Sequence, residues 1–83
     1  MDTNTLVFEN GNKGGIRVKP LQYPTKYVIN FTGSGTLLYG LNGSTPHKEI
    51  HPHVAATVIV DNDSLMMDWD VDADSEIQWQ SFG

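Results

Sequence analysis

Hydrophobic residues occupy every second position through the C-terminal third of the chain, with two turn-like breaks. The series runs through Val54, Ala56, Val58 and Val60, then Leu65, Met67, Trp69 and Val71, and then Ile77 and Trp79. A period of two is typical of a strand with one buried face, because successive side chains leave opposite faces of the pleat. This region is therefore predicted to form a three-strand antiparallel meander with one apolar face.

The two breaks suggest how these strands pair. If Val60 lies opposite Leu65 across the turn at residues 61–64, then Val58 meets Met67, Ala56 meets Trp69 and Val54 meets Val71. A second turn centred on Asp74 would place Val71 opposite Ile77 and Trp69 opposite Trp79. This register keeps every apolar residue on one side and predicts a contact between the two tryptophans.

Shorter runs of the same period cover the rest of the chain. Strands are predicted at residues 5–9, 16–19, 26–32 and 36–41, with at most a short strand at residues 48–50. The 36–41 run is apolar on both faces, which favours a central strand, whereas Pro20 and Pro24 place the segment between them at a sheet edge or in a connection between sheets. About seven short strands without a helical period indicate one all-β domain at residues 1–83, a small antiparallel β-sandwich or barrel.

The same alternation predicts the core. Its expected members are Val58, Val60, Leu65, Met67, Trp69, Val71, Ile77 and Trp79. A chain of 83 residues buries only about 60% of the surface that its unfolded form exposes. It also lacks cysteine, so no disulfide framework or thiolate metal site supplements a thin core. Self-association is therefore the expected source of further stability.

The sequence contains no apolar run of about 18 residues and no basic, apolar leader at its start. We therefore expect neither a membrane span nor secretion by a signal peptide. The expected location is the cytoplasm, unless the protein leaves within an assembled particle.

Charge is unevenly distributed along the chain. The formal net charge of -5 argues against nucleic-acid binding, which requires basic residues to neutralise phosphates. Basic residues at Lys13, Arg17, Lys19 and Lys26 precede an acidic C-terminal third. Neighbouring strands could balance these charges within one chain, or a basic face of one subunit could meet an acidic face of the next.

Acidic residues alternate with the apolar ones near the C-terminus. Asp68, Asp70, Asp72, Asp74 and Glu76 are therefore expected together on the outer face of the meander, with Asp72 opposite Glu76. Like charges that oppose each other need compensation by solvent, by a cation or by basic side chains. The simplest interpretation is a solvated face that prevents edge aggregation, followed by a protein partner that pairs through Arg17, Lys19 or Lys26. A divalent cation at Asp72, Asp74 and Glu76 is the weaker alternative, and no cofactor is expected.

Three histidines at positions 47, 51 and 53 form the second candidate cluster. His51 and His53 would project to the same side of an extended chain, a spacing that suits zinc or nickel. Pro52 lies between them, and even together with His47 they do not make a complete set of metal ligands. A polar loop is the preferred interpretation, with a metal site as the alternative.

Catalysis has little support in the sequence. The serines lie in turns or near the C-terminus, and no cysteine is present to act as a thiolate. Exposed aromatic residues could bind sugars, but Trp69 and Trp79 share the parity of the core. The expectation is a protein that is not an enzyme.

The layout of the chain resembles that of small all-β accessory proteins of tailed bacteriophages, of the capsid decoration and head-fibre type. The resemblance rests on the order of TLVFENG, KYVINFTGSGTLLYGLNGS, VAATVIV, SLMMDWD and EIQWQSF, without a diagnostic residue. It implies a structural protein that forms homotrimers and docks on a capsid or tail surface, with residues 43–53 as a candidate contact. Two alternatives remain open: an acidic inhibitor that imitates nucleic acid toward a basic host protein, and a metal- or sugar-binding module.

Overall fold

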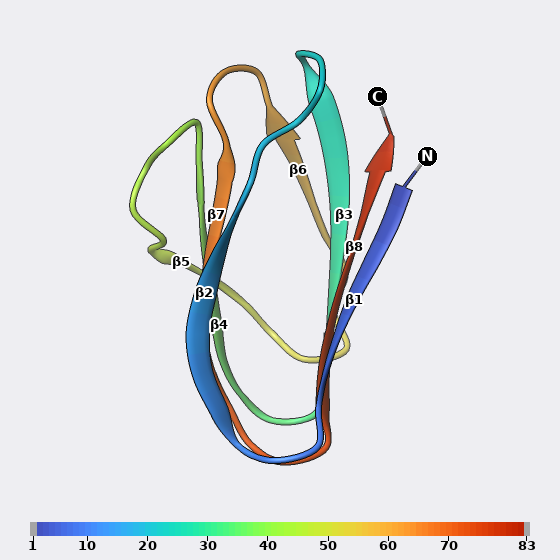
Figure 1. Cartoon of the computed structure of the whole chain (residues 1–83), viewed down its shortest axis with the longest axis vertical. Coiled ribbons are helices and arrows are strands. Elements are labelled where there is room, and N and C mark those ends of the chain that lie inside the picture. Colours follow the sequence, from blue (N-terminus) through green and yellow to red (C-terminus); the bar gives the residue numbers. More distant parts are fainter. Residues whose placement is uncertain (1, 83) are drawn as a thin grey trace.

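The computed structural model describes residues 2–82, which form eight strands in two four-stranded antiparallel sheets (Figure 1). The strands are β1 (Asp2–Phe8), β2 (Asn12–Val18), β3 (Thr25–Thr32), β4 (Gly35–Leu41), β5 (Lys48–Ile50), β6 (Ala56–Val60), β7 (Leu65–Val71) and β8 (Ser75–Phe82). Sheet A has the order β1-β8-β3-β6, and sheet B has the order β2-β7-β4-β5. The predicted all-β class is confirmed: of the two expected architectures the chain forms the sandwich, with eight strands in place of about seven.

A long two-stranded ribbon bends from one sheet into the other. Asp2 lies opposite Ser81 and Phe8 opposite Ser75 in sheet A, and Asn12 opposite Val71 continues the same register in sheet B. Figure 1 shows the two bends side by side at the lower end of the molecule. Strands β3 and β4 add to this ribbon in the same way, and the resulting strand order is that of a jelly roll.

Glycine and serine allow β3 to pass into β4 beside the bend between β7 and β8. Gly33 has a φ of 102°, and a Cβ atom at this position would lie 2.7 Å from the Cα atom of Ser75. The buried Ser75 hydroxyl donates to the carbonyl oxygen of Asp72 (2.8 Å) and accepts the backbone N–H of Ser34 (3.3 Å). The GSG sequence is therefore required by the close approach of two sheet crossings.

The core lies between the sheets and contains all of its expected members, whereas Val54, the first residue of the alternation, is exposed and precedes β6. Val60, Leu65, Met67, Val71 and Ile77 are almost fully buried, and so are Val58, Trp69 and Trp79. The apolar positions of β3, β4 and β5 complete it, namely Tyr27, Ile29, Phe31, Leu37 and Ile50. Strand β4 is central in sheet B and the segment with the prolines connects the two sheets, as predicted.

The pairing predicted for the last three strands is wrong, although these strands do run back and forth through the molecule between short turns (Figure 1). They alternate between sheets, so that Val60 lies opposite Thr25, Trp69 opposite Gly14 and Leu37, and Trp79 opposite Asn4 and Ile29. The physical reason is that both sheets bury their apolar faces in one core. Two consecutive strands with the same apolar alternation can therefore either pair as a hairpin in one sheet or lie in the two opposite sheets.

The predicted contact between the tryptophans is also replaced. The ring of Trp69 packs on Phe8 with a centroid separation of 5.5 Å and an interplanar angle of 49°. Its Nε1 atom donates a hydrogen bond to Oδ1 of Asn12 (2.9 Å). The indole thus lies beside the bend of the ribbon and links β7 to the first residues of β2.

Candidate interaction surfaces

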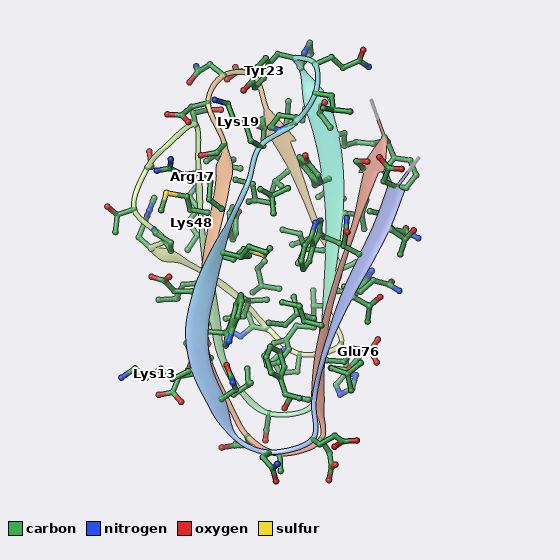
Figure 2. The ribbon with its side chains drawn as sticks, in the orientation of Figure 1. Lys13, Arg17, Lys19, Tyr23, Lys48 and Glu76 are labelled. Carbon is green, nitrogen blue, oxygen red and sulfur yellow. The ribbon has the colours of Figure 1, made fainter. Side chains whose placement is uncertain are left out.

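The acidic residues do not share one surface, contrary to the sequence-based expectation. Asp68 and Asp70 face outward from β7 in sheet B, while Glu76 faces outward from β8 in sheet A on the opposite side of the molecule (Figure 2). Glu76 lies opposite Val7 and Thr32 instead of Asp72. These acidic side chains do face outward, as predicted. Because β7 and β8 lie in different sheets, however, their outward-facing side chains leave the molecule on opposite sides.

Asp72 and Asp74 belong to the bend between these two strands. The carboxylate of Asp72 accepts a hydrogen bond from the Ser34 hydroxyl (2.7 Å), and its backbone N–H donates to the Ser34 carbonyl (3.0 Å). Asp74 has a φ of 61°, a conformation that aspartate tolerates better than most residues. The Asp72 side chain is therefore held by the turn, and Asp74 occupies a left-handed position in its backbone.

The basic residues are also dispersed. Lys13 and Arg17 face outward from β2, where Lys13 lies opposite Asp70 and Arg17 opposite Met66. Lys19 extends from the connection between β2 and β3 (Figure 2). Lys26 lies on sheet A, with its ammonium group 5.3 Å from the centre of the Phe82 ring. Lys13 and Asp70 thus occupy neighbouring cross-strand positions on sheet B, although no ion pair joins them in the described structure.

The histidines do not converge. The Nδ1 atom of His47 lies 2.7 Å from the carbonyl oxygen of Thr45, and that of His51 lies 3.8 Å from the Glu49 carboxylate. The backbone N–H of His53 donates to the Phe31 carbonyl (2.8 Å). Among residues 2–82, no three histidine, cysteine or acidic side chains are grouped as a metal site requires.

The outer face of sheet A is the surface that the sequence reasoning missed. Its central cross-strand rows hold only uncharged side chains, which we call the uncharged face: Thr3, Thr5, Val28, Asn30, Thr57, Gln78 and Gln80. Glu76 lies at one end and Lys26 at the other. The available signal was the alternation of Gln78 and Gln80 with the buried Ile77 and Trp79, which the neighbouring run of acids obscured.

The outer face of sheet B has the opposite character. Its outward positions carry Lys13, Arg17, Glu49, Asp68 and Asp70. Charges are therefore spread over the outer face of sheet B, whereas on the outer face of sheet A they lie only at the two ends of the uncharged face. Cores of protein interfaces are depleted in charged residues, so the two faces differ in the contacts that they favour.

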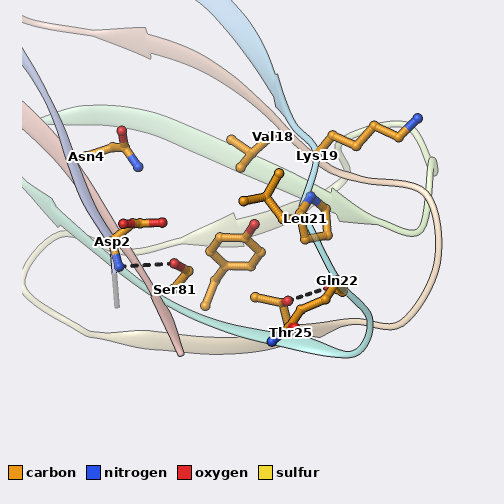
Figure 3. Close-up of a pocket in the computed structure, with 10 residues that line it drawn as sticks. Asp2, Asn4, Val18, Lys19, Leu21, Gln22, Thr25 and Ser81 are labelled. Carbon is orange, nitrogen blue, oxygen red and sulfur yellow. Dashed lines mark hydrogen bonds between the residues drawn. The ribbon is translucent and has the colours of Figure 1, made fainter. Parts of the chain in front are cut away.

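A cavity of about 340 Å³ opens at the end of the sandwich near residue 2 (Figure 3). Sheet A lines it with Asp2, Asn4, Thr25, Tyr27 and Ser81, while Val18 of β2 and Leu21 of the β2–β3 connection close the other side. Burial raises the pKa of the Tyr27 hydroxyl above its ordinary value of 10.0, and nearby Tyr23 and Asp2 add to this effect. The lining contains no histidine or cysteine, and Asp2 and Lys19 are its charged residues.

Comparisons with known proteins find no match for this chain among family models, curated proteins or solved structures. In the described residues, no helix has the length and apolar character needed to cross a membrane. A jelly roll supports many unrelated functions, so functional inference rests on the surfaces of this molecule.

Proposed function

We propose that this protein is a non-enzymatic assembly protein that associates with copies of itself through the sheet A side. The uncharged face is the observation that carries the proposal. It spans all four strands of sheet A, whereas the outer face of sheet B presents charges of both signs. A face without charges can be covered by another protein without the desolvation of ions.

The net charge supports the choice of this side. Each copy carries -5, so two copies repel each other unless they meet where like charges do not face one another. The sheet A side satisfies this condition along Thr3, Thr5, Gln78 and Gln80. The small size of the core supplies the thermodynamic motive, because association buries surface that one chain cannot bury alone.

The particular assembly that we propose is a bacteriophage particle, with the protein as an accessory or decoration component. This step rests on the resemblance of layout described above, which also implies a trimer. The loop at residues 43–53 is exposed over most of its length and remains the candidate contact with a capsid or tail surface.

The alternative functions receive less support from the geometry. An acidic inhibitor that imitates nucleic acid needs a contiguous array of carboxylates, but Asp70 and Glu76 lie on opposite sheets. A sugar platform needs exposed tryptophan, but Trp69 and Trp79 are 9% and 4% exposed.

Self-association can be measured directly. Sedimentation equilibrium should give a multiple of the 9.2 kDa chain mass, and the average mass should rise with protein concentration. NMR spectra recorded over the same concentrations should show amide shifts that change in β1, β8 and β3 but not in β2, β7 and β4. A mass of one chain at millimolar concentration would contradict the proposal, and shifts confined to sheet B would place the contact on the wrong side.

A further inference from the structure

Strand β1 is an edge strand of sheet A whose outer side has no partner strand in the described chain. It is seven residues long, whereas the other edge strands β6 and β5 have five and three. The fourth edge strand, β2, projects Lys13 and Arg17. Proteins usually protect exposed edges by short length, proline or charge. In β1 the sole charge is Asp2 at its first position, and the strand contains no lysine, proline or glycine.

The structure shows which backbone groups of β1 are open. The N–H of Asp2 donates to the Ser81 side chain, so the polar groups of Asp2 face β8. The Phe31 carbonyl accepts the N–H of His53, so the backbone groups of Phe31 point away from β8. Followed through the registers of β3 with β8 and of β8 with β1, this also directs the backbone groups of Asp2 toward β8. Since alternate residues of a strand point to opposite sides, the N–H and C=O groups of Thr3, Thr5 and Val7 face the open edge.

These open groups form a self-complementary set. We infer that β1 pairs with β1 of a second copy of the chain, antiparallel, about a two-fold axis at Thr5. Thr5 then exchanges both backbone hydrogen bonds with Thr5 of the copy, and Thr3 does so with Val7 of the copy. Every open N–H and C=O group of the strand gains a partner in this register, as in other cases of strand addition at a sheet edge.

Side chains and charges agree with this pairing. Thr3, Thr5 and Val7 lie on the outer face, so the new contact places β-branched residues side by side, which is favourable across strands. Val7, which is 66% exposed in one chain, would be partly covered. Asp2 would lie opposite Phe8 of the copy, so the two Asp2 carboxylates would be about 20 Å apart. That distance exceeds the screening length of about 8 Å at physiological salt.

The pairing deepens the proposed function, on which it rests. It joins sheet A of two copies into one continuous sheet and places their uncharged faces in one plane. The joined face stays open in the pair and can be covered by further copies, while residues 43–53 remain the candidate contact with a particle. Because the contact is two-fold, it gives a dimer in place of the trimer that the layout implies.

Proline at the centre of the edge tests the backbone contact. Thr5→Pro removes an N–H that faces solvent in a single chain, so the fold should persist, as proline is accepted on edge strands. The control is Thr57→Pro on β6. Val58 faces Tyr27 in the β3–β6 ladder, so the N–H of Thr57 faces the other open edge of sheet A. We expect sedimentation to give twice 9.2 kDa for the parent protein and Thr57→Pro, and one chain mass for Thr5→Pro.

A cysteine variant tests the same contact without relying on the fold to accept proline in β1. The chain has no cysteine, and Cα atoms of directly opposed residues lie about 5.5 Å apart, within the range for a disulfide. Mild oxidation should therefore convert Thr5→Cys, but not Thr57→Cys, into a covalent dimer. If the parent protein is a monomer, the proposed function fails together with the pairing. If it associates while Thr5→Pro keeps its mass and Thr5→Cys does not cross-link, the pairing alone is overturned.

Discussion

Trp69 provides the most direct test of the core and of the ribbon bend. Replacement of Trp69 by Ala removes a side chain that is 9% exposed, packs on Phe8 and donates a hydrogen bond to Asn12. Deletion of a buried aromatic side chain reduces the free energy of unfolding by about 3 to 5 kcal/mol. A chain of this length has a total of about 4 to 12 kcal/mol, at about 0.05 to 0.15 kcal/mol per residue. Trp69→Ala should therefore lose a large part of the stability.

A double-mutant cycle separates the hydrogen bond from packing. Trp69→Phe keeps an aromatic ring but loses the Nε1 donor, and Asn12→Ala removes the acceptor. The bond spans 2.9 Å, and Asn12 is exposed, so its free carbonyl would return to water without a burial penalty. The coupling should be about 0.5 to 1.5 kcal/mol, the net contribution of a typical hydrogen bond.

Urea unfolding followed by circular dichroism and by the fluorescence of Trp79 measures these values, provided that the denaturant dependence stays unchanged. Leu21→Ala is the matched control, because Leu21 is fully exposed and its truncation should change stability by less than about 0.5 kcal/mol. A loss below about 1 kcal/mol for Trp69→Ala would refute the burial of the indole. A coupling below about 0.3 kcal/mol would show that the bond to Asn12 contributes nothing.

Two further predictions concern the sheet crossing and Tyr27. Gly33→Ala should destabilise the fold by about 2 kcal/mol or more, because Gly33 has a positive φ and a Cβ atom would collide with Ser75. Thermal unfolding should show no such loss for Gly11→Ala, where the nearest atom is 3.5 Å away. The raised pKa of Tyr27 means that the unfolded state ionises first, so stability should fall as the pH rises above 10.0. Tyr27→Phe should reduce that alkaline loss in denaturant titrations, and an unchanged loss would exclude Tyr27 as its source.

The strands could be predicted because each is a local pattern. The strand from Leu65 to Val71 lies where the alternation placed it, and the predicted core residues are buried. At residues 48–50, where the sequence has no clear period, the short strand that was allowed there is present. Burial of one face of a strand leaves a period of two in the sequence whatever the strand pairs with. The extent of β2 was less visible, because Gly14 and Gly15 weaken the pattern in its first half.

The candidate surfaces were less accessible from the sequence. The alternating acids indicated a single face, yet Asp70 lies opposite Lys13 in sheet B while Glu76 lies on sheet A. Gln78 and Thr5, which form part of the uncharged face, are more than 70 residues apart, and a register between two distant strands joins them. Neither placement follows from neighbours along the chain.

The all-β class and the C-terminal part of the core follow from the amino-acid order alone, because they depend on one strand facing one apolar environment. Which strands share a sheet depends on the packing of the whole chain. Both sheets of a sandwich bury their faces in the same core, so hydrophobic alternation is identical for a hairpin and for a crossing between sheets. That choice separates the acids, assembles the uncharged face and leaves the edge of β1 open.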